Sequence, residues 1–158
     1  MGDEKRYTVE ESHRRFAADL FNLTWDLLEK ERRTAEDDER MVQAAYASRF
    51  HWSEVGTPTN QAVGEWQIAR VLATLRRPRS SLQHAQRALA IIEENGITGF
   101  YRASAYEGLA RAYSVAGDRE EARRYVRLAQ QEGEKLTDLE DKELLLDQLS
   151  DLPEYEGE

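Results

Sequence analysis

The sequence has no cysteine, only three prolines in 158 residues, and no long apolar run. Without cysteine it forms no disulfide framework, thiolate metal site or cysteine nucleophile. A membrane span needs about 18 consecutive apolar residues, so the short apolar runs argue against a membrane protein. The charged start, residues 1–6, lacks the apolar run of a secretory signal. We therefore expect a cytoplasmic chain of one domain, since this length is enough to bury a core.

The apolar residues that are present favour helices. There are 19 Ala and 17 Leu but only seven Val and four Ile, and this ratio disfavours strands. Capping residues followed by an acid three positions later mark helix starts at Thr8, Thr34, Asp118 and Asp138. Pro58 and Pro78 mark two more, because proline fits the first helical position. An all-α fold with seven helices is predicted, at about 8–33, 35–54, 58–76, 78–95, 98–116, 118–135 and 138–151.

A shift of 41 residues brings matching side chains into register across three successive helix pairs. Leu27, Ile68 and Leu109 align, and Trp25 aligns with Trp66. Small residues also recur where packed helices approach closely. The pattern predicts three antiparallel helix hairpins over about 8–55, 57–96 and 98–135, stacked as a helical solenoid. The alternative is a simple bundle in which abundant alanine produces the matches by coincidence.

In the third unit, aromatic, leucine, small and turn-glycine positions follow in a fixed order: Tyr106, Leu109, Ala110, Tyr113, Gly117, Ala122, Val126 and Ala129. This order resembles the tetratricopeptide repeat, a family of paired helices that stack into a right-handed superhelix with a concave groove. The period of 41 is similar to the longer repeat of kinesin light chains and many bacterial regulators. The second unit departs from the motif at Arg76, where the turn glycine would stand, and at Glu65, where an aromatic would stand.

The resemblance covers about residues 16–135 and implies a right-handed α-solenoid of about three hairpins. Leucines in the segment 138–151 predict a helix that either caps the open end of this stack or forms a homodimer contact. Residues 153–158 would be an acidic tail. A further interpretation is that this chain is one regulatory segment of a larger signalling system.

The resemblance also implies that the first helix of each hairpin lines the groove. Carrying the family's groove positions onto this chain selects Trp25, Glu29, Trp66, Arg70, Glu107 and Arg111. Aromatic rings with arginine partners are enriched at interface hot spots, so these residues predict a protein or peptide partner. The competing interpretation is that both tryptophans are core residues. The Lys and Asn pair that clamps a C-terminal carboxylate in some family members is missing, which argues against a chaperone-tail receptor.

Charge is unevenly distributed along the chain. The whole net charge of −9 lies in residues 132–158, whereas residues 67–92 contain five arginines and no acid. Within this basic stretch Arg76, Arg77 and Arg79 form a candidate anion patch beside a helix start. The alternatives are a solvated hairpin tip, or contact with the acidic tail of this chain or of a second copy. A pI of about 5.0 disfavours nucleic acid as a partner.

Catalytic motifs are missing, so we expect neither an enzyme nor a cofactor. The sequence has no Gly-x-Ser-x-Gly elbow and no glycine-rich phosphate loop. Its histidines, at positions 13, 51 and 84, fall on three different predicted helices, and no spacing places two ligands on one helix face. The alternative is a small-molecule- or metal-binding helical protein, and possibly an enzyme, that uses His51, His84 and Glu65.

Overall fold

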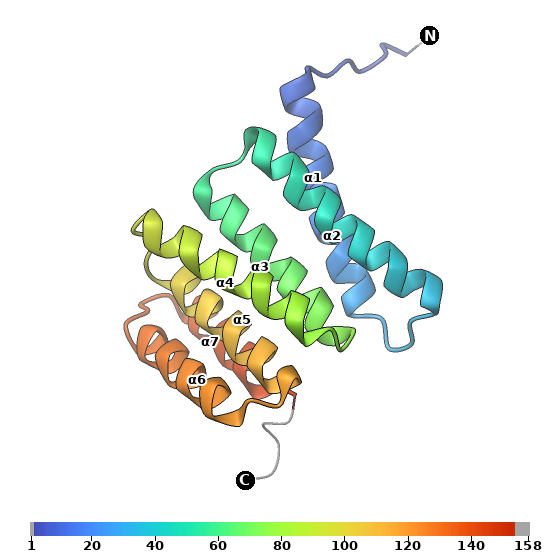
Figure 1. The fold of residues 1–158 in the computed structure, drawn as a ribbon. Coiled ribbons are helices and arrows are strands. Elements are labelled where there is room, and N and C mark those ends of the chain that lie inside the picture. The colour runs from blue at the N-terminus through green and yellow to red at the C-terminus, as the bar shows by residue number, and fades with distance from the viewer. Residues whose placement is uncertain (1, 154–158) are drawn as a thin grey trace.

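The computed structural model describes residues 2–153, which form seven helices and no strand (Figure 1). The all-α class is thereby confirmed. The predicted acidic tail lies, from residue 154 on, outside the described residues. The helices are α1 (Val9–Leu28), α2 (Ala35–Val55), α3 (Pro58–Thr74), α4 (Pro78–Glu94), α5 (Phe100–Ala116), α6 (Arg119–Glu134) and α7 (Leu139–Ser150).

The helix starts follow the capping signals. Thr8 and Thr34 each form a capping box, in which the cap hydroxyl accepts an N–H from the third helical residue and that residue's carboxylate accepts the cap N–H. Thr57 forms a third box with Asn60. Helix α1 ends five residues earlier than predicted, because Arg33 turns back to donate to the Leu28 carbonyl at 3.2 Å.

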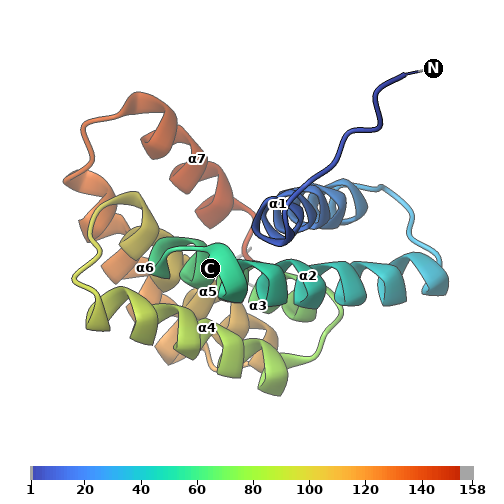
Figure 2. The same cartoon turned by 90° about the horizontal axis from the view of Figure 1, so that it is seen from above.

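Consecutive helices pack in pairs. Helix α1 packs on α2, α3 on α4, and α5 on α6, while α2 contacts α3 and α4 contacts α5 (Figure 1). Helices α3 and α5 also touch directly, and α7 folds back against α5 and α6. Figure 2 shows α1 and α7 on the same side of the molecule. This arrangement brings residues of α1, α3, α5 and α7 to one face.

The residues that align at a spacing of 41 form the core. Ile68 and Leu109 are each 1% exposed, Leu27 is 7% exposed, and the aligned small residues of α4 and α6 are buried as well. Small residues also permit close approach at Gly108, where a Cβ atom would lie 2.9 Å from the Trp66 ring. The aligned leucine and isoleucine positions are therefore buried, whereas Trp25 is only half-buried.

The turns after α3 and α5 share an unusual backbone conformation. Gly117 has a φ of 82°, and Arg76, 41 residues earlier, has a φ of 58°. An arginine thus adopts the left-handed conformation that the sequence comparison assigned to a turn glycine, at a cost of roughly 1 kcal/mol. The two turns have equivalent geometry although their side chains differ.

Helix α7 buries Leu145 and Leu149 against the last helix pair and leaves Leu139 and Leu146 exposed. Within residues 2–153, no helix combines the length and the apolar character needed to cross a membrane.

Candidate binding site

Four of the six predicted groove residues meet at the carboxylate of Glu107, and a fifth, Trp25, packs beside them. Trp66 Nε1 donates to Glu107 Oε2 at 2.8 Å, and Arg111 Nε donates to Oε1 at 2.8 Å. Arg70 forms an ion pair with the same Oε1 at 3.7 Å. The Trp25 ring lies against Trp66 with a centroid separation of 5.6 Å, and the Arg70 guanidinium lies 5.8 Å from the Trp25 ring centroid.

A second carboxylate, contributed from the end of α7, balances the two arginines. Asp151 lies 2.6 Å from Arg111 and 3.3 Å from Arg70, and Arg111 also donates to the Gln148 carbonyl at 2.9 Å. Burial, reinforced by the neighbouring Arg111 charge, lowers the pKa of Arg70. For Arg111 burial acts in the same direction, but Glu107 and Asp151 outweigh it and raise the pKa of the guanidinium. We refer to Trp66, Arg70, Glu107, Arg111 and Asp151 as the central network.

Most of the central network is inaccessible to a partner. Glu107 is 0% exposed, Arg111 5% and Trp66 8%. Their polar atoms already bind one another, so these residues fix the wall of the site. Trp25 is only half-buried and Glu29 is exposed, and these two predicted groove residues remain available for contact.

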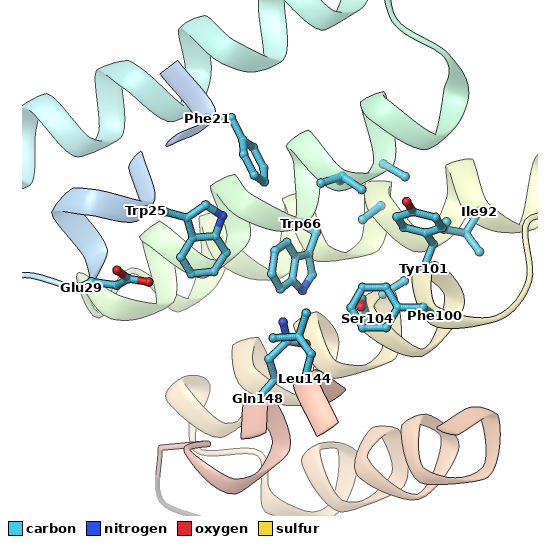
Figure 3. A pocket seen from close by; sticks show the side chains of 14 residues that line it. Phe21, Trp25, Glu29, Trp66, Ile92, Phe100, Tyr101, Ser104, Leu144 and Gln148 are labelled. Atoms are coloured by element: carbon cyan, nitrogen blue, oxygen red, sulfur yellow. The ribbon is translucent and has the colours of Figure 1, made fainter. Parts of the chain in front are cut away.

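A cavity of about 360 Å³ opens beside this wall, between α1, α3, α5 and α7 (Figure 3). Its lining is mainly apolar and includes five aromatic residues, Phe21, Trp25, Trp66, Phe100 and Tyr101. Glu29, Ser104 and Gln148 are the polar residues of the lining. A volume of this size lies within the range of ligand sites, roughly 300–1,000 Å³.

Sequence reasoning identified Trp25, Glu29 and Trp66 in this lining and missed the other aromatic residues. Phe21 was detectable, because it lies four residues before Trp25 on the same helix face. Phe100 and Tyr101 open α5 just before its aligned positions, so the 41-residue shift gives no signal for them. Leu144 and Gln148 join the site only because α7 folds back over it.

The three histidines lie in two separate clusters. His84 Nδ1 lies 2.6 Å from Glu65, and its Nε2 lies 2.7 Å from the Tyr46 hydroxyl. His51 lies elsewhere, with its Nδ1 2.8 Å from that of His13. Of the three residues proposed for a metal or chemical site, His84 and Glu65 therefore meet and His51 lies apart from them. Among the described residues, no group of three His, Asp or Glu side chains is arranged to hold a metal ion.

Tyr46, His84 and Glu65 form one hydrogen-bonded chain with the connectivity of a proton relay. Burial opposes ionisation of Glu65, yet the hydrogen bond and charge of His84, together with Arg49, lower its pKa. Burial, followed by the Glu65 charge, raises the pKa of Tyr46. A phenol with a raised pKa stays protonated at neutral pH and is a poor nucleophile.

The predicted anion patch lies in the turn between α3 and α4. Arg76, Arg77 and Arg79 are exposed, and within residues 2–153 none of them forms an ion pair with a carboxylate. Arg77 occupies the N-cap of α4 without a side-chain cap hydrogen bond. The acidic segment instead reaches Arg70 and Arg111 through Asp151.

No family model matches the chain, and searches of curated proteins and of solved structures find no match. Its function therefore has to be inferred from residues and geometry.

Proposed function

We propose that this chain is a non-enzymatic binding module that holds a peptide or protein partner on the face formed by α1, α3 and α5. The observation that carries the proposal is the contact series Trp25, Trp66 and Glu107. These residues are spaced by 41, come from the first helix of each pair, and each contacts the next. A tetratricopeptide-like right-handed solenoid, with hairpins at about 8–55, 57–96 and 98–135, accounts for this series.

The mechanism is rigid display. The central network holds the Trp66 ring in one position, so little side-chain entropy is lost when a partner docks beside it. The half-buried Trp25 ring and the apolar cavity would receive an apolar side chain of the partner. Within the described residues Glu29 forms no ion pair, so it favours a basic residue in the docked segment.

The enzyme alternative has less support. It required His51, His84 and Glu65 in one site, and His51 lies with His13 instead. A second copy of the chain is the other partner considered, because Leu139 and Leu146 are exposed on α7.

Selection from a random peptide display library tests the proposal. The intact chain is the bait, and the selected peptides are then measured against Trp25→Ala and Glu29→Arg, with Trp52→Ala as the matched tryptophan control outside the cavity lining. We expect peptides rich in basic and apolar residues, whose affinity falls at least about tenfold with either groove variant and is unchanged in the control. Peptides that bind all variants equally would refute the proposed face.

A further inference from the structure

Helix α7 carries apolar side chains on the side that faces away from the rest of the fold. Its inward leucines, Leu145 and Leu149, pack in the core. Leu139 is 73% exposed and Leu146 is 62% exposed. These two exposed leucines are seven residues apart, which places them on one face of the helix, two turns from each other. Figure 2 shows α7 at the edge of the molecule, where a second chain could reach this face.

An open groove between α6 and α7 continues this apolar face. The groove has a volume of about 390 Å³, and its apolar walls come from Gly133, Leu145, Leu146 and Leu149. Leu146 borders the groove and also lies in line with Leu139, so the exposed leucines and the groove form one continuous surface. A continuous apolar surface marks a contact site more strongly than single scattered leucines do.

Two opposite charges lie between the exposed leucines. Lys142 and Glu143 follow Leu139 by three and four residues, so they flank the line that joins Leu139 to Leu146. Glu143 is exposed and Lys142 is half-buried, and within residues 2–153 neither forms an ion pair. We refer to Leu139, Lys142, Glu143 and Leu146 as the α7 stripe.

The α7 stripe is complementary to a second copy of itself. Its leucine pair and its charge pair are centred on the same point, midway between Lys142 and Glu143. Two copies of α7 that lie antiparallel about this point place Leu139 of one copy opposite Leu146 of the other. The same two-fold axis places Lys142 opposite Glu143, twice. A parallel arrangement would oppose lysine to lysine and glutamate to glutamate, so the charges favour the antiparallel one.

We propose that the α7 stripe is a homodimer interface in which two copies of this chain pair antiparallel. Leu139 of the second copy lies over Leu146, at the edge of the groove between α6 and α7. Leu144 and Gln148 line the cavity from the opposite side of α7. The interface therefore leaves the cavity open, and it does not depend on the proposed partner-docking function.

The dimer is expected to be weak. The stripe is one helix wide, so it buries less than the roughly 800 Å² per partner of a standard interface. The acids of residues 132–158 also repel those of the second copy, and this repulsion is screened by salt. At roughly 0.15 M ionic strength we expect a dissociation constant on the order of 0.1 mM.

Sedimentation equilibrium of the intact chain, from about 10 µM to about 1 mM, tests self-association. We expect the average mass to rise from that of the monomer toward that of the dimer. Leu146→Glu should weaken dimerisation at least about tenfold. Leu144→Glu adds the same charge on the opposite side of α7 and should leave dimerisation unchanged. A chain that stays monomeric throughout would assign the stripe to a different partner and overturn the proposal, as would equal effects of the two variants.

Charge reversal tests the antiparallel pairing. In Lys142→Glu and in Glu143→Lys, like charges oppose each other at both contacts of the dimer. Each variant alone should therefore dimerise at least about tenfold more weakly than the parent chain. An equimolar mixture of the two variants restores opposite charges at both contacts, so we expect its average mass to approach that of the parent.

Both variants should keep the circular dichroism of the parent chain, because the two positions lie outside the core. Single variants that dimerise like the parent would overturn the proposed pairing. A mixture that stays as monomeric as its components would overturn it as well.

Discussion

At the scale of single residues, Glu107 has an unusual position, because it is fully buried and bound to two arginines and an indole. Glu107→Gln keeps its shape but removes the charge, so Arg70 and Arg111 would retain only the half-exposed Asp151. We expect the free energy of unfolding to fall by about 3–5 kcal/mol in denaturant titrations. Glu29→Gln, on the exposed side of the site, should change it by less than about 0.5 kcal/mol. Similar small losses for both variants would show that the central network does not stabilise the fold.

Arg76 offers a test in the opposite direction, because its backbone conformation favours glycine. Arg76→Gly removes the left-handed strain and adds flexibility to the unfolded chain, so we expect a net stabilisation of about 0.5–1 kcal/mol. The reciprocal change, Gly117→Arg, should destabilise by about 1–2 kcal/mol. Chemical denaturation of both variants measures this, and a destabilised Arg76→Gly would show that the arginine side chain is itself needed.

His51 gives the fold a pH dependence of known sign. Burial, followed by the charge of His13, lowers the pKa of His51 below its ordinary value. The unfolded chain therefore takes up a proton at higher pH than the folded chain does. The contribution of neutral His51 to the free energy of unfolding is fully present above about pH 6.5. It is lost as the pH falls through the pKa of His51 in the folded chain. Between roughly pH 7.5 and 5.5, we expect the melting temperature of the His51→Gln variant to fall less than that of the parent chain. An identical drop in both would refute this assignment.

At the scale of helices, α7 both completes the core and closes the site. Leu145 is 2% exposed and its neighbour Leu146 is 62% exposed, so the two form a matched pair. Leu145→Ala should cost about 2–4 kcal/mol and Leu146→Ala less than about 0.5 kcal/mol. Hydrogen exchange in α7 should rise only in the first variant. Equal effects would show that α7 does not pack on α5 and α6 as described.

Helix positions could be predicted because their signals are local. Caps at Thr8 and Thr34 and prolines at 58 and 78 each determine a start, and observed bounds agree with the prediction within two residues except at the end of α1. That end depends on a side chain turning back, Arg33 to the Leu28 carbonyl, which has no periodic signature.

The candidate site could be predicted only in part. Trp25, Trp66 and Glu107 are found by their spacing, but the spacing does not reveal that Glu107 is buried as a counterion. Asp151 lies 40 residues from Arg111 in sequence, and no local pattern links them. Its role follows from the direction in which α7 folds back, which is a tertiary property.

At the scale of the whole molecule, the charge asymmetry of the sequence is partly used inside the fold. The acidic C-terminal segment supplies Asp151 to arginines of α3 and α5, so helices from three parts of the chain are joined by one set of ion pairs. Trp25, Glu29 and the cavity remain as the accessible part of that face. We propose that this face is where the protein binds its partner.

Heteronuclear NMR of the three tryptophan indole N–H groups tests whether the partner binds at this face. Trp25 and Trp66 line the cavity, whereas Trp52 lies near the end of α2, outside that lining. On titration with a peptide selected by display, we predict that the Trp25 and Trp66 indole signals shift and the Trp52 signal does not, with Trp25→Phe providing the assignment. A shift of the Trp52 signal while the other two remain in place would contradict binding at this face.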